Sequence, residues 1–257
     1  MSRRFRIDPR LALVIDLVVL VGAWQLAVVV IDRPFLPGPL TVARTFVAEL
    51  GSGLLHHAWI SAQRVLLSVL IGTAIAAPLA ILAAENRVLD NFLSPLIYFL
   101  YPTPKVVFLP IIVVLVGLGN PSIIFLITLI VFFQIFVIIR DAVGRVPQAT
   151  LDSVASLGAG RLERLRYVYL PLSLGAVMTA IKVSIGTAIA VLFIAESIGN
   201  NVGLGYYIVV EQWNRFAYAR MYAGILAIAL LGSLMFALVS WGERVANRWR
   251  AETGPDR

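Results

Sequence analysis

The chain has 257 residues, of which 60% are hydrophobic and 14% charged, and its formal net charge is +7. Average soluble domains carry about 25% charged residues, so this composition excludes an ordinary soluble domain and an intrinsically disordered chain. The sequence contains no cysteine, which excludes disulfides, thiolate metal sites and cysteine nucleophiles. The composition therefore indicates a single polytopic membrane domain.

Six apolar stretches are long enough to cross a bilayer, which takes a helix of about 20 residues. In chain order they are 11–31, 59–84, 92–118, 122–139, 172–196 and 221–241. The first follows an arginine-rich start, but it is too long for the apolar core of a signal peptide and no small-residue cleavage site follows it, so we expect it to be retained. We predict an all-α integral membrane protein in which residues 1–257 form one transmembrane domain of six helices.

Two segments of this plan are irregular. Residues 32–57 are predicted to be a loop that holds a short amphipathic helix at 41–50. The third stretch contains Pro102, Pro104 and Pro110, which predicts a broken helix because proline removes a backbone donor and frees carbonyls. Irregular backbone at membrane depth is tolerated where it is buried or lines a cavity. The break at 101–105 is therefore either part of a transport pathway or a kink that serves packing.

The arginines are unevenly distributed between the two faces of the membrane. Six spans place both termini, the turn 85–90 and the loop 140–169 on one face, which carries fourteen arginines, whereas the opposite face carries four. Cytoplasmic loops hold the excess of Lys and Arg. We therefore expect both termini and the loop 140–169 to be cytoplasmic.

Small residues recur at helical spacing in three of the spans. They are Gly72, Ala76 and Ala80 in the second, Ala176, Ala180, Ser184 and Ala188 in the fifth, and Gly224 and Gly232 in the sixth. Such stripes let helix backbones approach closely in lipid, so we predict a tightly packed bundle.

The common motifs of nucleotide-binding and hydrolytic enzymes are absent from the sequence. There is no Gly-x-x-x-x-Gly-Lys-Ser/Thr phosphate loop, no His-Glu-x-x-His motif and no Gly-x-Ser-x-Gly elbow. The only histidines, His56 and His57, are adjacent and do not share a helix face, so we interpret them as a solvated or interfacial pair. We expect no enzyme, and no catalytic residue, metal site or cofactor in this chain.

Five ionisable residues fall within the predicted spans: Asp16, Arg64, Lys105, Lys182 and Glu196. A charge near mid-bilayer costs roughly 2.5–3.5 kcal/mol on insertion scales, so such groups usually face the bundle or a wet cavity. We expect structural roles for Asp16 and Arg64, and Arg64 lies near enough to the outer end of its helix to extend to the interface. For Lys182 and Glu196, structural and functional roles both remain open.

The loop between the fourth and fifth spans has its own internal structure. Pro147 suits the first turn of a helix, and Gly158 suits its left-handed end. A second amphipathic segment, 161–169, then leads to Pro171 at the start of the fifth span. The pattern predicts a rigid helix–glycine–helix projection, a form that can fit a groove on a partner and transmit its motion.

This loop resembles the EAA loop of ATP-binding cassette (ABC) importer permeases. Ser156-Leu157-Gly158-Ala159 and Leu170-Pro171 match that pattern, whereas Asp152-Ser153-Val154 stands where Glu-Ala-Ala is usual, so the carboxylate is shortened and the small pair is altered. Further matches to the nitrate/sulfonate/taurine-type permeases lie in order along residues 35–248. They are Phe35-Leu-Pro-Gly-Pro, Tyr101-Pro-Thr-Pro-Lys, Val116-Gly-Leu-Gly-Asn and Gly199-Asn-Asn-Val-Gly-Leu-Gly-Tyr206.

The resemblance implies a type I ABC importer permease in the plasma (inner) membrane of a prokaryote. It implies a permease core at about 57–242 and a coupling loop at about 146–171. Its implied partners are a second permease copy forming a homodimer, an ATPase dimer that binds ATP and Mg, and an extracytoplasmic solute-binding protein. The residues that it assigns to coupling are Asp152, Ser153, Ser156, Gly158, Ala159, Arg161, Leu170 and Pro171. We assign Thr103, Gln134, Ser184 and Glu196 to the translocation pathway.

The solute and the driving force leave alternatives open. The family handles small oxyanions such as nitrate, sulfonates and taurine, but also vitamin or heterocyclic precursors. Lys182 and the general basicity favour anions, although topology accounts for most of that basicity. A secondary transporter acting alone would show inverted repeats and ion-coupling charges, and no clear internal repeat is visible. A membrane-embedded enzyme would need catalytic groups that the sequence lacks.

Overall fold

The computed structural model describes residues 9–246, and these residues contain helices and connecting segments but no strand. The long helices are α1 (Pro9–Ile31), α3 (Leu55–Glu85), α6 (Asn120–Val143), α9 (Leu170–Glu196) and α11 (Tyr218–Ala246). The shorter ones are α2 (Pro39–Glu49), α4 (Arg87–Leu100), α5 (Leu109–Val116), α7 (Gln148–Ser156), α8 (Arg161–Arg164) and α10 (Leu204–Tyr206). Single turns of π- or 3-10 type are η1 (Leu50–Leu54), η2 (Lys105–Phe108), η3 (Leu165–Tyr169), η4 (Tyr207–Gln212) and η5 (Trp213–Arg215).

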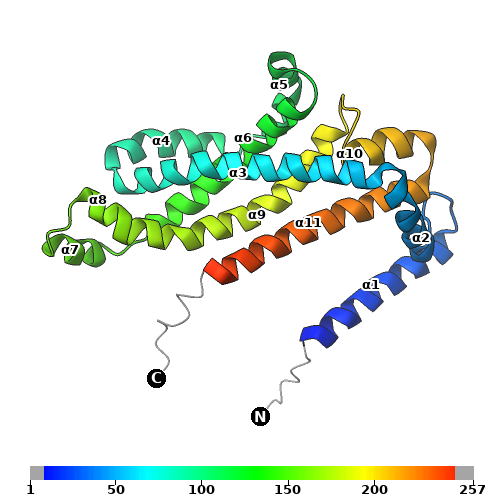
Figure 1. Ribbon diagram of the computed structural model, residues 1–257, viewed down its shortest axis with the longest axis horizontal. Coiled ribbons are helices and arrows are strands. Elements are labelled where there is room, and N and C mark those ends of the chain that lie inside the picture. Colours follow the sequence, from blue (N-terminus) through cyan, green and yellow to red (C-terminus); the bar gives the residue numbers. More distant parts are fainter. Residues whose placement is uncertain (1–8, 247–257) are drawn as a thin grey trace, which may run out of the picture.

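The membrane spans follow the predicted plan. Among the described residues, five helices are long and apolar enough to cross a bilayer, and a sixth span is obtained if α4 is taken together with the segment 105–116. These two pieces are bent by 85° at the proline-rich break, and α5 turns away from the bundle (Figure 1). The all-α fold and the broken third span are therefore confirmed.

The core of the bundle is formed by α3, α6 and α9, which pack against one another. A methyl group added at Gly72 would lie 2.7 Å from the Val131 side chain, and one added at Gly232 would lie 2.9 Å from the Ile189 side chain. Gly72 and Gly232, two members of the predicted small-residue stripes, therefore lie at tight contacts between helices. The molecule is elongated: α7 and α8 lie at one end of its long axis, and α2 and α10 lie toward the other end (Figure 1).

At the end that holds α2 and α10, α11 packs against α2 and η4. Glu49 joins these elements: its Oε2 accepts a hydrogen bond of 3.0 Å from the Tyr207 hydroxyl and its Oε1 lies 2.9 Å from Arg220 Nε. Burial, followed by the hydrogen bond to Glu49, raises the pKa of Tyr207 above its ordinary range. The phenol therefore remains a proton donor at neutral pH and fixes η4 to α2.

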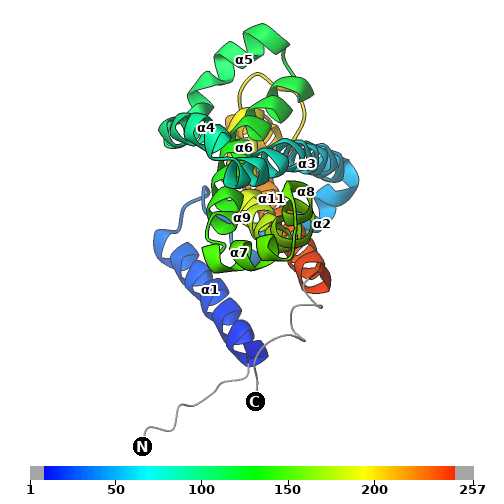
Figure 2. The same cartoon turned by 90° about the vertical axis from the view of Figure 1, so that its left-hand side faces the viewer.

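Helix α1 stands apart from the other helices in both views (Figures 1 and 2). None of the 18 residues of its apolar window, 14–31, is buried. Its contacts include the stacking of Trp24 on Tyr222 at 6.1 Å and a few residues of α2. The apolar surface of α1 is therefore free to face lipid or another chain.

Two expectations need correction, and a third concerns residues that the structure does not describe. Residues 32–57 are not mainly a loop, because α2 and η1 lead into α3 through a kink at Gly53, whose φ is +121°. The fifth span is longer than predicted, because helical structure is continuous over the 36 residues of Arg161–Glu196. Several arginines counted for orientation lie outside the described residues, namely Arg3, Arg4, Arg6, Arg248, Arg250 and Arg257.

Candidate functional site

The loop between α6 and α9 forms a protruding structure, which we call the knuckle (residues 147–170). Its first helix, α7, contains no buried residue. The helix ends at Ser156, and Gly158, two residues later, has a left-handed φ of +82°. The Gly158 and Ala159 amides donate to carbonyls of the last turn of α7 at 2.9 and 3.3 Å. The predicted glycine stop is confirmed, whereas Pro147 precedes α7 as its N-cap instead of lying within it.

The polar residues singled out on the knuckle bond mainly within α7. Asp152 accepts from the Gln148 amide at 3.0 Å, and the hydroxyls of Ser153 and Ser156 donate to backbone carbonyls at 2.7 and 2.8 Å. Apolar side chains beside them are uncovered, since Leu157 is 86% exposed and Leu162 is 72% exposed. This exposed apolar tip, held on a rigid turn, has the character of a docking surface.

The base of the knuckle is joined to the bundle by charges. Arg161 Nε lies 3.3 Å from Glu85 Oε2 at the end of α3, and Arg140 holds Asp90 with two hydrogen bonds of 2.9 and 2.6 Å. Glu85, Asp90 and Arg140 line one polar cavity of about 400 Å³, to which the knuckle contributes Gln148, Arg164 and Tyr169. Arg161 therefore links the knuckle to the end of α3, whereas the Arg140–Asp90 pair links α6 to α4.

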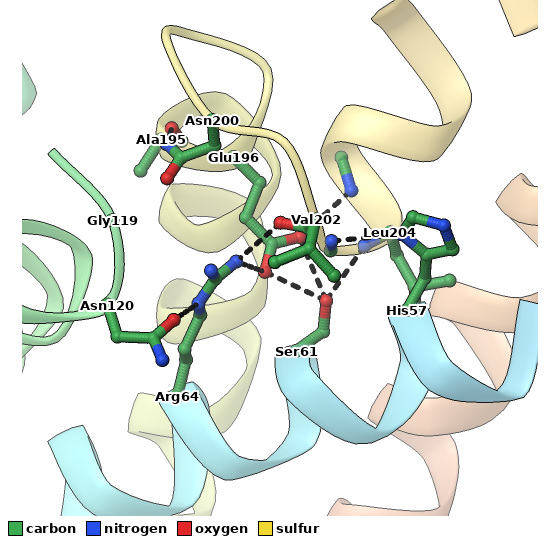
Figure 3. Close-up of polar contacts among 12 residues, drawn as sticks. His57, Ser61, Arg64, Gly119, Asn120, Ala195, Glu196, Asn200, Val202 and Leu204 are labelled. Carbon is green, nitrogen blue, oxygen red and sulfur yellow. Dashed lines mark hydrogen bonds and ion pairs between the residues drawn. The ribbon is translucent and has the colours of Figure 1, made fainter. Parts of the chain in front are cut away.

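A second polar site lies at the opposite end of α3 (Figure 3). Arg64 Nη1 donates to Glu196 Oε1 at 2.6 Å, and the two side chains are 2% and 0% exposed. Ser61 Oγ contacts both carboxylate oxygens of Glu196, at 2.8 and 2.9 Å, and Arg64 Nε donates to Asn120 Oδ1 at 2.8 Å. We call this set the outer clamp (Ser61, Arg64, Asn120, Glu196 and the loop 197–205). Arg64 does not extend to the interface, because Glu196 holds it inside the bundle.

The outer clamp holds the glycine-rich loop by its backbone. Gly205 N donates to Glu196 Oε2 at 2.9 Å and Leu204 N donates to Ser61 Oγ at 2.8 Å, while the Val202 carbonyl accepts from Arg64 at 2.9 Å. A methyl group at Gly203, where φ is +122°, would lie 2.3 Å from the Glu196 carboxyl carbon. Only glycine permits so close an approach of the loop to the carboxylate.

His57 also belongs to this end of the molecule. Its Nδ1 accepts a hydrogen bond of 3.1 Å from Gly203 N, and its Nε2 lies 3.6 Å from Glu211. His56 is exposed, so the two histidines differ in environment and only His56 fits the expected solvated pair. Among residues 9–246 no group of three His, Asp or Glu side chains is placed to hold a metal ion.

The break in the third span lines a cavity of about 340 Å³, and Thr103 and Gln134 are both on its wall. Ser184 and Glu196 are not on it. Ser184 is buried in α9 with its hydroxyl unbonded among the described residues, and Glu196 belongs to the outer clamp. Lys182, whose role was open, forms an ion pair of 2.5 Å with Glu243 on α11.

Sequence reasoning flagged Arg64 and Glu196 separately but missed their pairing. The signal was the presence of two opposite charges near the same membrane face, in spans that share small-residue packing stripes. Sequence reasoning also missed that Glu85, the last residue of α3, pairs with Arg161 of the knuckle, because no motif marks Glu85.

Comparison with known proteins places these sites in context. Residues 76–250 match the family described as "Binding-protein-dependent transport system inner membrane component". The chain is 28% identical to a putative aliphatic sulfonates transport permease protein, SsuC, of Bacillus subtilis, over 90% of this chain and 85% of the relative. It is also 28% identical to the riboflavin transport system permease protein RibX of Chloroflexus aurantiacus, over 95% and 91%.

The fold has a solved counterpart. A chain of the MetNI methionine ABC transporter in an inward-facing conformation superposes with a TM-score of 0.68 at 19% identity, covering 76% of this chain and 96% of that chain. At this identity the likeness establishes the fold.

Proposed function

The chain belongs to the family of binding-protein-dependent transport system inner membrane components. On this premise we propose that a separate ATPase binds the knuckle and that ATP-driven motion of the ATPase moves it. As a permease subunit of an ABC importer, it moves a small solute across the membrane. The observation that carries the coupling proposal is the exposed apolar tip: Leu157 and Leu162 are 86% and 72% exposed on a turn fixed by Gly158. A single chain has no use for such a tip unless a partner covers it.

The coupling residues divide by position. Asp152, Ser153 and Ser156 present polar groups on the exposed side of α7. Gly158 and Ala159 set the angle between α7 and α8. Arg161 links the knuckle to Glu85, and Leu170 and Pro171 carry the motion into α9. In this account the ATPase dimer holds ATP and Mg, so the chain needs no phosphate loop.

The remaining partners follow from the same family. A second permease copy, forming a homodimer, and an extracytoplasmic solute-binding protein complete the importer in the inner membrane of a prokaryote. We place both termini and the knuckle in the cytoplasm, as the arginine distribution predicts. The uncovered apolar faces of α1 and of the segments around the break support burial in lipid or against the second copy, since Val18 is 65% exposed and Val114 84%.

Two solute classes have support. A small sulfonate-like anion is favoured by the resemblance to SsuC, and a vitamin or heterocyclic precursor is favoured by the equal identity to RibX. For the pathway we retain Thr103 and Gln134, which share a cavity, with Ser184 and Glu196 as less central members. A stand-alone secondary transporter would leave the knuckle without a purpose.

Co-purification tests the proposal directly. The tagged permease is co-expressed with its candidate ABC ATPase subunit. A Leu157→Asp variant is compared with Phe216→Asp, because Phe216 is also 71% exposed but lies between η5 and α11. We expect Leu157→Asp to lose the ATPase and Phe216→Asp to retain it. Equal retention by both variants would show that the knuckle tip is not the docking surface.

A further inference from the structure

The polar cavity at the base of the knuckle is enclosed by four parts of the chain. They are the end of α3, the start of α4, the end of α6 with the residues that follow it, and the knuckle. Its volume of about 400 Å³ lies within the roughly 300–1,000 Å³ range of small-molecule sites, most of which are mainly apolar. Here, by contrast, the lining holds five charged side chains, namely Glu85, Arg87, Asp90, Arg140 and Arg164. The cavity is therefore suited to a small and highly polar group.

Two buried atoms of opposite hydrogen-bonding type are left unbonded in this lining. The Glu85 side chain is only 4% exposed, and its Oε2 faces Arg161 at 3.3 Å. Its Oε1, an acceptor, has no hydrogen-bond partner among the described residues. Arg164 Nε, a donor, is likewise buried and unbonded within residues 9–246. Buried polar atoms in folded proteins nearly always have a partner, so the lining calls for a ligand that donates to Glu85 and accepts from Arg164.

The charges of the lining favour an anion as the group that accepts from Arg164. The charge of Asp90 is balanced by Arg140, whose Nη2 lies 2.6 Å from Asp90 Oδ2. Neither Arg87 nor Arg164 forms an ion pair with another residue of the described part of the chain. Arginine presents several N–H donors in a planar fork that matches the oxygens of a phosphate group. A phosphate therefore suits the unpaired guanidinium of Arg164.

The cavity lies at the ends of membrane spans, where lipid headgroups are found. Glu85 is the last residue of α3 and Arg87 is the first residue of α4, and both helices belong to candidate spans. Directly after Arg87, α4 presents apolar side chains to its surroundings, since Val88 and Phe92 are 79% and 73% exposed. Basic pockets between spanning helices on the cytoplasmic side bind lipid phosphates. The phosphate can thus come from a lipid headgroup or from a soluble ester of the same chemistry.

We propose that this cavity binds a phosphate ester whose substituent carries a hydrogen-bond donor, as ethanolamine and glycerol headgroups do. Arg164 holds the phosphate oxygens, and Glu85 Oε1 accepts from the ammonium or hydroxyl group of the substituent. A choline ester has the same phosphate, but its quaternary ammonium has no N–H and leaves Glu85 unsatisfied. The bound ester bridges the knuckle and the end of α3. The proposal therefore goes beyond movement of a solute and adds a ligand at the base of the docking element.

Esters of ethanolamine and choline provide a matched test in two arms. In the soluble arm, the full-length permease in detergent is titrated by calorimetry with phosphoethanolamine and with phosphocholine. In the lipid arm, native mass spectrometry compares the binding of phosphatidylethanolamine and phosphatidylcholine added in equal amounts. We expect the ethanolamine form to bind about tenfold more tightly, because a hydrogen bond to a charged group has about this strength. A preference in the lipid arm alone identifies a headgroup site, whereas a preference in the soluble arm identifies a site that also takes free esters.

Paired variants assign the preference to the cavity. Arg164→Gln should weaken binding of the ethanolamine form about tenfold, whereas Arg166→Gln removes the same charge from an exposed side chain outside the lining and should leave binding unchanged. Glu85→Met should remove the preference over choline, and Glu163→Met, at an exposed carboxylate of the knuckle, should retain it. Arg164 is only partly buried, so its variant keeps the test decisive even where Glu85→Met fails to fold.

Two results would overturn the inference. One is equal binding of the ethanolamine and choline forms by the unmodified chain in both arms, which is the behaviour of a cavity that holds only water. The other is an equal effect of Arg164→Gln and Arg166→Gln, which would place the bound ester elsewhere on the basic surface of the chain.

The outcome is separable from that of the coupling proposal. Both arms measure binding to the permease itself and require no ATPase, no ATP and no solute-binding protein. If Leu157→Asp releases the ATPase but neither arm shows a preference, the cavity site is wrong and the docking of the knuckle stands. If a preference that depends on Arg164 is found but the ATPase does not associate with the knuckle, the coupling proposal is wrong and the site stands.

Discussion

The two ends of α3 are held in opposite ways. In the outer clamp, Arg64 and Glu196 are 2% and 0% exposed, and their polar atoms bond to the same chain. At the knuckle, Arg161 is 62% exposed and α7 has no buried residue. The single chain thus buries and pairs the charged groups of the outer clamp, but leaves the knuckle exposed to solvent. The difference supports the proposal that the outer clamp stabilises the fold of the single chain and that the knuckle docks on a partner.

Glu196→Gln should have the largest effect on stability. It leaves the Arg64 guanidinium buried without a counter-ion, which costs about 3–5 kcal/mol, so we expect a lower melting temperature and poor recovery in detergent. Thermal unfolding monitored by size-exclusion chromatography measures this. The control is Glu243→Gln in the more exposed pair with Lys182, where a loss of about 0–1 kcal/mol is expected. Equal losses in the two variants would remove the special role of the outer clamp.

Gly203→Ala should destabilise the same end by a smaller amount. The added methyl group meets the Glu196 carboxylate, and φ at this position is +122°, a strain of about 1–3 kcal/mol. Gly186→Ala is the matched control, because no atom lies within 4 Å of the added methyl group and alanine favours a helix by about 1 kcal/mol. The same unfolding assay should separate the two, and a Gly203→Ala protein as stable as Gly186→Ala would count against the described loop.

Gly158→Pro should leave stability nearly unchanged but abolish coupling. Proline holds φ near −65° and cannot adopt the φ of +82° at the end of α7, so α7 and α8 lose their relative angle. Asparagine tolerates left-handed backbone, and Gly158→Asn should retain coupling. The readout is ATP hydrolysis stimulated by the solute-loaded binding protein in reconstituted transporter. Normal stimulation of Gly158→Pro would contradict the role of the knuckle.

Arg161→Gln should give the smallest change. Its ion pair with Glu85 is largely solvent-exposed on the arginine side, so its loss costs about 0–1 kcal/mol of stability. We expect a modest rise in the amount of ATP hydrolysed per solute imported, because the link from knuckle to α3 is weakened. Arg166→Gln, at an exposed position in the same segment, serves as control. Identical ratios for both variants would show that Glu85 transmits no motion.

The sequence predicted the features that local rules determine. Apolar length marked the spans, Pro102 and Pro104 marked the break, and Gly158 marked the end of α7. It did not predict that Arg64 and Glu196 meet, because 132 positions separate them and only the packing of α3 against α9 brings them together. For the same reason Thr103 and Gln134 could be chosen as pathway residues without the knowledge that they share a cavity wall with Lys105.

Site-directed crosslinking at the knuckle tip tests the central claim most directly. In the cysteine-free chain, Leu157→Cys and Asn201→Cys are each treated with a bifunctional maleimide in the assembled transporter. We predict a covalent adduct between Leu157→Cys and the ATPase subunit, and none from Asn201→Cys, which a membrane-impermeant maleimide should instead label from outside intact cells. Free labelling of Leu157→Cys from outside the cell, with no ATPase adduct, would contradict the account.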